Sequence, residues 1–305
     1  MAGTTVAICA YNEAANIAHL LEHILACARE GEDIAEILVV SSGSTDGTDD
    51  IVRALAGQNP RLRLVAEETR RGKLAAVNTV LREARSDRIV LVDADALPAP
   101  GALQRLAAGL EQAGVGGIGT RNVPVNANET LVARAASLMW EVHHRVSAGE
   151  PMLGGDIIAF RRLITALTEE DGVNDDYLIE CDLRSRGLSI VYDPLAMTYM
   201  RVPTNVADFV RQRRRIHFGF LKSRKTRPLK STQKLSNVLP ATLALLRERP
   251  SVLPLMVFLF GINSLSKLLA YLDLATGHSH TAWVPSPSTK ARINLPSDEE
   301  PLEPA

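Results

Sequence analysis

Two aspartates separated by one residue, Asp93 and Asp95, directly follow an apolar run that ends at Val92. Carboxylate oxygens are the ligands that Mg²⁺ and Mn²⁺ prefer, and such a cation usually completes its coordination with phosphate oxygens. The pair therefore indicates a divalent cation site that holds a diphosphate ligand. Two aspartates after a strand also commonly cap the following turn, and the pair by itself leaves this alternative open.

A second acidic pair, Asp175 and Asp176, precedes a stretch with helical character over residues 177–186. An ionised carboxylate at the mouth of a pocket suits the removal of a proton from a hydroxyl group. We expect the neighbouring Asp175 to raise the proton affinity of Asp176. The structural alternative is that both acids cap the N-terminus of the helix.

Short apolar, β-branched runs alternate with longer helical patterns in the first part of the chain. This alternation predicts an α/β fold with a mainly parallel, doubly wound sheet. The predicted strands cover residues 6–9, 37–40, 62–65 and 89–92, and the predicted helices cover residues 14–28, 48–55, 74–83 and 101–112.

Polar residues follow each predicted strand, where ligands bind in open parallel sheets. Tyr11 and Glu13 follow the first strand, residues 41–46 the second, and Gly72 with Lys73 the third. The first turn lacks the G-x-G-x-x-G pattern of dinucleotide-binding folds, and Gly72-Lys73 lacks the rest of a P-loop. The ligand is therefore expected to be held by side chains and a metal ion rather than by a glycine-rich loop.

In order and spacing, these segments resemble family 2 glycosyltransferases of the GT-A fold over residues 4–220. The resemblance extends to the group with a Gln-x-x-Arg-Trp motif, which includes polysaccharide synthases and ceramide glucosyltransferases. The matching segments are residues 10–13, 39–48, 72–73 with Asn78, 93–95, 154–155 with 159–162, 174–176 and 212–216.

The resemblance implies an inverting transfer of a sugar from a nucleotide diphosphate carrier, with UDP as the expected nucleotide. Asp176 would be the catalytic base, and Asp93 and Asp95 would hold Mg²⁺ or Mn²⁺, with Asp93 also contacting the donor. The other donor-binding residues would be Tyr11, Glu13, Ser41, Ser42, Asp46, Lys73 and Asn78. The residues on the acceptor side would be Gly154, Gly155, Asp156, Asp175, Gln212 and Arg215.

The chain departs from the family pattern at two places. Ile216 replaces the tryptophan of the Gln-x-x-Arg-Trp motif, which removes a stacking platform for an acceptor sugar and argues against a long polymer product. Ser41 and Ser42 replace two aspartates that many relatives carry, and hydroxyl groups bind a base edge without charge. Trp140, His143 and His144 share a helical stretch that either contacts the acceptor or forms an ordinary helix surface.

The net charge of −1 gives no general signal for nucleic acid, but basic residues gather in one region. Between Met200 and Lys234 the chain carries eleven Lys or Arg and one acid, Asp208. An apolar run of 18 residues follows at 255–272, interrupted by polar residues from 263 to 267. This run is long enough for one membrane crossing, but its polar cluster equally favours a helix in the interface, paired with residues 235–246.

We therefore expect a nucleotide-sugar-binding half at 1–120 and an acceptor-binding, catalytic half at 121–232. Membrane-associated helices are expected at 233–272, and a disordered tail rich in Pro, Ser and acids at 273–305. The basic stretch before the apolar run places the catalytic part on the cytoplasmic side of a membrane. The expected partners are a nucleotide-sugar donor, a lipid or glycan acceptor and the membrane. Two alternatives remain, namely a non-catalytic sugar-nucleotide-binding protein and a nucleotidyltransferase, although the glycine-rich loop of the latter is absent.

Overall fold

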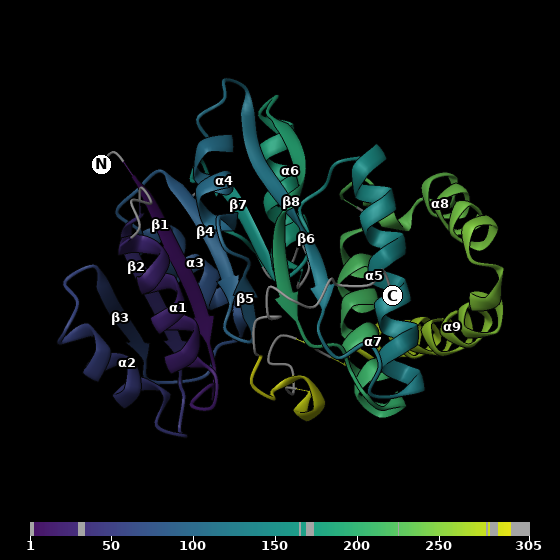
Figure 1. The fold of residues 1–305 in the computed structure, drawn as a ribbon, viewed down its shortest axis with the longest axis horizontal. Helices are drawn as coiled ribbons and strands as arrows, with labels where there is room; N and C mark the ends of the chain where they lie inside the picture. The colour runs from purple at the N-terminus through teal and green to yellow at the C-terminus, as the bar shows by residue number, and fades with distance from the viewer. Residues whose placement is uncertain are drawn as a thin grey trace.

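A mixed sheet of eight strands forms the centre of the molecule (Figure 1). The computed structural model describes residues 3–29, 34–164, 166–168, 174–224, 226–278, 280 and 286–293. The strand order is β3-β2-β1-β4-β7-β6-β8-β5. The strands are β1 (Thr4–Ala10), β2 (Ile34–Ser42), β3 (Leu62–Glu67), β4 (Arg88–Asp93), β5 (Ala96–Pro98), β6 (Val115–Pro124), β7 (Ile157–Arg161) and β8 (Ser189–Met200).

The first four strands are parallel, as predicted, and each contains one of the predicted apolar runs. Strand β7 is antiparallel to both β4 and β6, whereas β6 and β8 are parallel to each other. The antiparallel direction of β7 has a consequence for the site. It brings the start of β7 to the end of β4, where Asp93 lies.

Helices cover both faces of the sheet. Successive strand residues point to opposite faces, so both faces carry apolar side chains that need a covering layer. On one face, Ile8 and Val90 pack with residues of α1 and α4, and on the other, Ala7 and Leu91 pack with residues of α3 and α6. The helices are α1 (Ile17–Arg29), α2 (Thr48–Ala56), α3 (Lys73–Glu83), α4 (Ala102–Gly109), α5 (Leu131–Gly149), α6 (Asp175–Ser185), α7 (Val206–Ser223), α8 (Leu235–Glu248) and α9 (Leu253–Thr276).

Helices α5, α7, α8 and α9 gather at the end of the molecule opposite to β3 and α2 (Figure 1). A buried apolar cluster joins Val132 of α5, Phe209 of α7 and Ile262 of α9. A second cluster joins Val142 of α5 to Leu245 of α8. The two C-terminal helices expected at 233–272 are therefore present as α8 and α9, and they pack on α5 and α7.

The segment 286–293 returns to the N-terminal half of the protein. Ile293 is buried in the core cluster that contains Ile17, and the backbone carbonyl of Lys290 accepts a hydrogen bond of 3.0 Å from the side chain of Asn16. Composition predicted a disordered tail from residue 273, whereas α9 continues to Thr276 and this segment is packed. A single isoleucine that completes a distant core leaves no periodic signal in the sequence. Residues 294–305 lie outside the described part.

Candidate active site

A cavity of ≈ 460 Å³ opens at the carboxyl ends of β1, β2 and β4 and continues between α5, α7, α8 and α9. Most of the residues that the sequence assigned to the site line this cavity. They are Tyr11, Glu13, Ser42, Lys73, Asp93, Asp95, Gly154, Gly155, Asp156, Asp175, Asp176, Gln212 and Arg215. The end near Asp93 is acidic, and the end between the helices is apolar.

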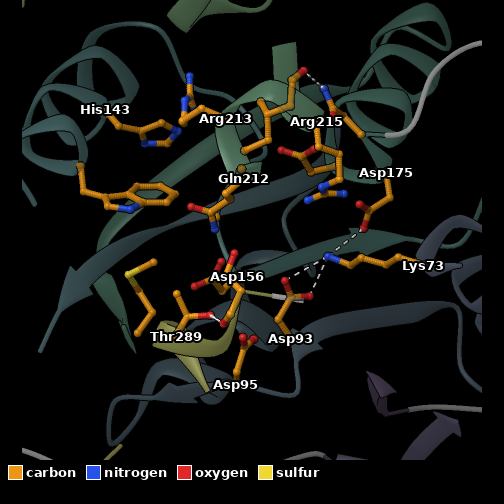
Figure 2. A pocket seen from close by; sticks show the side chains of 18 of the residues that line it. Lys73, Asp93, Asp95, His143, Asp156, Asp175, Gln212, Arg213, Arg215 and Thr289 are labelled. Atoms are coloured by element: carbon orange, nitrogen blue, oxygen red, sulfur yellow. Dashed lines mark hydrogen bonds and ion pairs between the residues drawn. The ribbon is translucent and has the colours of Figure 1, made fainter. Parts of the chain in front are cut away.

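Lys73 joins the two halves of the site. Its Nζ lies 2.7 Å from Oδ1 of Asp93 and 3.4 Å from Oδ2 of Asp175 (Figure 2). Gly72, with φ +91°, turns the chain so that α3 begins at Lys73. Burial lowers the pKa of Lys73, but the charges of Asp175 and Asp93 outweigh it and hold the pKa well above its ordinary value. Lys73 therefore stays cationic between two carboxylates.

Three carboxylates gather at the acidic end of the cavity, from Asp93, Asp95 and Asp156 (Figure 2). Burial, together with the charge of Asp93, raises the pKa of Asp95 to about 6. Burial and the charges of Asp93 and Asp95 raise the pKa of Asp156 well above its ordinary value. Such a set of hard oxygen atoms fits a divalent cation, since the cation would relieve the repulsion among the acids.

Asp156, which the resemblance assigned to the acceptor side, lies near both groups of acids. The charges of Asp93 and Asp95, and also that of Asp176, raise its pKa. The reason for its position is the antiparallel pairing of β4 with β7, in which Val92 faces Ile157. The residue before Ile157 thereby reaches the cation end of the cavity.

Asp176 belongs to a second group with Lys230, His143 and Gly154. Lys230 Nζ donates a hydrogen bond of 2.5 Å to Asp176 Oδ2. A Cβ atom at Gly154 would lie 3.2 Å from Lys230 Nζ, 3.3 Å from His143 Nε2 and 3.4 Å from Asp176 Oδ2. Glycine at this position therefore leaves open the space where the three side chains meet.

The pKa of Asp176 moves in the direction opposite to the one that the sequence suggested. Burial raises it, but the charge and hydrogen bond of Lys230 outweigh burial and hold the pKa below its ordinary value. The expected rise caused by Asp175 is therefore wrong, because Lys73 and Lys230 each supply a cation to one of the two acids. Burial and the charge of Lys230 also lower the pKa of His143 to about 3, so this imidazole is neutral.

Three consecutive arginines of α7 point in three directions, as the helical rotation per residue requires. Arg213 Nε donates a hydrogen bond of 3.1 Å to Asn263 Oδ1 on α9. Arg214 forms a bidentate ion pair with Asp273 that ties α7 to α9. Arg215 lines the cavity and interacts with the charges of Asp175, Asp93 and Asp176.

The loop after β1 forms one end of the cavity, where the resemblance expects the nucleoside. The guanidinium of Arg70 lies 3.8 Å from the centroid of the Tyr11 ring. Glu13 is buried and forms an ion pair with Lys290, which comes from the segment 286–293. The C-terminal segment thus closes one wall of the cavity.

Three residues assigned to the donor do not line the cavity. Ser41 is fully buried and donates a hydrogen bond to Ser44 Oγ. Asp46 accepts hydrogen bonds from the backbone of Ala14 and from Thr48, and so holds two loops together. Asn78 exchanges two hydrogen bonds with the backbone of Leu167. Their side chains position the loops around the cavity.

The sequence assigned no role to four residues of the wall, namely Arg70, Arg213, Lys230 and Lys290. Trp140 and His143 do line the cavity, which favours the acceptor-contacting alternative for that helical stretch. Lys230 and Arg213 fall within the basic stretch 200–234, where nothing in the composition separates a buried cation from an exposed one. Only their contacts with Asp176 and Asn263 distinguish them.

A further set of ligand atoms, from Asp273, His278 and His280, lies at the end of α9. Both carboxylate oxygens of Asp273 already bind Arg214, and His280 Nε2 lies 2.8 Å from one of them. Because Arg214 neutralises the carboxylate of Asp273, we interpret this group as an ion-pair network between α7 and α9.

Known proteins of similar sequence or structure transfer sugars. A poly-β-1,6-N-acetyl-D-glucosamine synthase of Staphylococcus aureus strain COL is 23% identical over 221 residues, which cover 69% of this chain and 53% of that protein. The chain thus spans about half the length of this curated relative.

Two solved structures share the fold. One is the mannosyltransferase PcManGT of Pyrobaculum calidifontis in complex with GDP-Man and Mn²⁺, with a TM-score of 0.66, 23% identity, and coverage of 91% of this chain and 88% of that chain. The other is glucosyl-3-phosphoglycerate synthase of Mycobacterium tuberculosis in complex with Mn²⁺, UDP and glucosyl-3-phosphoglycerate, with a TM-score of 0.53, 23% identity, and coverage of 73% and 80%.

The family itself follows from the sequence match. The chain matches glycosyl transferase family 2 over residues 5–161 and glycosyl transferase family group 2 over residues 88–288. The first match ends on β7, just past Asp156, and the second spans Asp93 to the segment that carries Ser288. Matched over more than half of its 305 residues and folded as an α/β GT-A sheet, the protein belongs to glycosyltransferase family 2.

Proposed function

We propose that this enzyme transfers a sugar from a UDP-sugar to a hydroxyl group of a lipid or glycan acceptor, with inversion at the anomeric carbon. The observation that carries the proposal is the arrangement of two acidic groups in one cavity. Asp93, Asp95 and Asp156 form one group, and Asp176 lies in the wall of the same cavity beside Gly154 and Lys230. One group suits a nucleotide diphosphate and its cation, and the other suits the acceptor hydroxyl.

The cofactor of the proposed reaction is Mn²⁺ or Mg²⁺. Asp93, Asp95 and Asp156 would hold the ion, which would supply positive charge to the departing diphosphate. Related folds bind these ions together with a nucleotide, as the complexes of PcManGT and glucosyl-3-phosphoglycerate synthase do. PcManGT binds a GDP-sugar and the other protein binds UDP, so a GDP-sugar is the matched control for the proposed UDP-sugar donor.

The residues of this chain divide the reaction between them. Asp176 accepts the proton of the acceptor hydroxyl as its oxygen forms a bond to the anomeric carbon. The bond from that carbon to the diphosphate oxygen breaks, and its electron pair leaves with UDP. Lys73 and Arg215 lie at the acidic end, where they add positive charge near the leaving group. Attack on the face opposite to the leaving group inverts the configuration.

The test separates binding from turnover. We expect Asp95→Ala to lose the Mn²⁺-dependent part of UDP binding, because it removes a carboxylate from the cation site. We expect Asp176→Asn to bind UDP with Mn²⁺ normally but to release no UDP from UDP-sugars. Asp182→Asn is the matched control, since Asp182 is on the same helix and pairs with Arg186 at the surface. Normal turnover by Asp176→Asn would remove this residue from the base role.

We further propose that α9 lies in the interface of a membrane rather than across it. Among the described residues, one helix, over Pro250–Thr276, is long and apolar enough to span a membrane. Its polar residues Ser266 and Asp273 are buried against the enzyme, while Leu268 and Leu272 are more than half exposed. The exposed face is mainly apolar and also carries Ser264 and Lys267. Apolar side chains with a few polar groups among them suit a helix lying in the lipid surface, with the catalytic part on the cytoplasmic side.

A further inference from the structure

Arg213 is a cation without an acidic partner. It is partly buried in the cavity wall, and its Nε donates a hydrogen bond to the amide oxygen of Asn263. Among the described residues, no carboxylate pairs with Arg213, and burial alone lowers its pKa to about 10. A partly buried charge without a counter-charge has lost part of its hydration, which makes a bound anion a suitable partner for Arg213.

The two arginines that follow it show the contrast. Arg214 forms its ion pair with Asp273, and Arg215 has the charges of Asp175, Asp93 and Asp176 around it. Arg213 instead lies beside His143, at the end of the cavity away from Asp93 and Asp95 (Figure 2). It is therefore placed for a group other than the diphosphate of the donor.

The neighbours of Arg213 leave its charge uncompensated. His143 and His217 are both neutral, since burial lowers the pKa of each to about 3. Lys230 is already neutralised by Asp176 at 2.5 Å. This part of the cavity therefore carries one net positive charge, and it lies next to the proposed base. The hydrogen bond to Asn263 fixes the guanidinium plane through Nε, which leaves its two NH₂ groups for a bidentate anion.

Beyond Arg213 the cavity wall becomes apolar. Residues of three helices form it, namely Met139 and Trp140 of α5, Val238 of α8, and Met256, Leu259 and Phe260 of α9. Phe260 is 73% exposed and Leu239, one residue after Val238, is 48% exposed, so this wall continues onto the apolar outer face of α8 and α9. A ligand that extends from Arg213 away from the donor thus passes over apolar side chains toward the proposed membrane surface.

We propose that the acceptor is a lipid phosphate, whose phosphate is bound by Arg213 and whose apolar chain lies along the wall formed by α5, α8 and α9. This inference rests on the proposed function, and it names the class of acceptor for that same site. The guanidinium provides a planar pair of donors for phosphate oxygens. The apolar wall and the exposed faces of α8 and α9 provide the path for the chain. The phosphate holds the acceptor beside Asp176.

The test measures binding to the full chain in a neutral detergent, with excess UDP and Mn²⁺ so that the donor end is filled. The probes are farnesyl phosphate, farnesol and inorganic phosphate, and isothermal titration calorimetry measures the affinity of each. We expect farnesyl phosphate to bind roughly ten- to a hundredfold more tightly than farnesol, as a charge-assisted contact does, and inorganic phosphate to bind weakly. Inorganic phosphate binding as tightly as farnesyl phosphate would overturn the lipid part of the proposal.

Two substitutions of Arg213 and one control variant decide whether this residue is responsible. Arg213→Ala should remove the preference for farnesyl phosphate over farnesol, and Arg213→Lys should retain part of it. Arg224→Ala removes an exposed arginine at the C-terminal end of α7 and should change nothing. An equal loss in Arg224→Ala would mean general attraction of the basic helix to anionic micelles. An unchanged preference in Arg213→Ala would equally overturn the proposal.

UDP binding is measured in parallel for every variant. Retained UDP binding by Arg213→Ala shows that the variant is folded and that its defect concerns the acceptor end. A wild-type protein that binds farnesyl phosphate through Arg213 but releases no UDP from any sugar donor would refute the proposed function and leave this site standing. The two proposals therefore fail on different readouts.

Discussion

The backbone N–H of Asp93 donates a hydrogen bond of 2.8 Å to the carbonyl oxygen of Asp156, so two acidic residues far apart in the sequence share one place. The bond joins the end of β4 to the start of its antiparallel neighbour β7. It brings the Asp156 carboxylate close enough to Asp93 and Asp95 for their charges to raise its pKa. The proposed cation site thus has three acids where the sequence indicated two.

Substitution of Asp156 tests this third ligand. We expect Asp156→Asn to weaken Mn²⁺-dependent UDP binding by roughly tenfold or more, as the loss of a contact at a metal site commonly does. Mn²⁺ titration of UDP binding measures the effect. Asp87→Asn is the control, because Asp87 is an exposed acid whose side chain is 84% accessible. Unchanged Mn²⁺ dependence in Asp156→Asn would return Asp156 to the acceptor side.

The ion pair between Lys230 and Asp176 predicts a pH effect. Lys230 holds the pKa of Asp176 below its ordinary value, so the base stays ionised in the wild-type enzyme as the pH falls. Lys230→Met removes the largest influence that lowers the pKa of Asp176, while burial still raises it. The pKa of Asp176 should therefore rise in this variant. The acidic limb of the kcat/KM profile should therefore move to higher pH. A limb at the same pH in both proteins would show that Lys230 does not set the protonation of the base.

Alanine substitutions at Gly155 and at the nearby Gly149 should differ in their effect on stability. The φ of Gly155 is +103°, and a Cβ atom there would lie 2.2 Å from Oδ1 of Asn122. Gly155→Ala should therefore lower the free energy of unfolding by about 1–3 kcal/mol. Gly149→Ala, at the end of α5, meets no atom within 4 Å and should be neutral or slightly stabilising. Chemical denaturation of both variants measures the difference, and equal stability would contradict the strain.

The apolar outer face of α9 predicts membrane binding. Leu268 and Leu272 are 58% and 52% exposed, and burial of the exposed part of each in lipid contributes about 1–1.5 kcal/mol, roughly half the value for a fully exposed leucine. The double variant Leu268→Glu/Leu272→Glu should bind neutral lipid vesicles at least tenfold more weakly in a flotation assay. Leu195→Glu serves as the control, because Leu195 is 63% exposed on β8. Equal vesicle binding by the double variant and the wild type would show that this face does not contact lipid.

The sequence predicted the first half of the fold well because local patterns determine it. The four apolar runs and the helices between them form a parallel sheet, and the polar residues that follow the strands meet at one edge. Asp93, Asp95 and Asp176 could be predicted to line the cavity because an acidic pair after a strand or before a helix is a local pattern in the sequence.

The remaining features depend on contacts between distant segments. Asp156 reaches the cation end only because β7 is antiparallel to β4, and no local pattern encodes strand direction. Lys230 reverses the expected pKa shift of Asp176 from 54 positions away. Ser41 takes the position of an aspartate that many relatives carry, and its fully buried hydroxyl donates a hydrogen bond to Ser44. Arg213, Arg214 and Arg215 look alike in the sequence. Contacts of the first two with α9, and of the third with acids of β4 and α6, separate their environments.

The most direct test of the whole account is the rate at which Asp176→Asn releases UDP from a UDP-sugar when Mn²⁺ and acceptor are saturating. The substitution keeps the shape of the side chain and removes its ability to accept a proton. With UDP affinity unchanged, the account predicts a rate lower by roughly 10²- to 10⁴-fold, the usual contribution of a general base. A rate within a few-fold of the wild type would mean that the acceptor proton leaves by another route and that the second acidic group is not part of the chemistry.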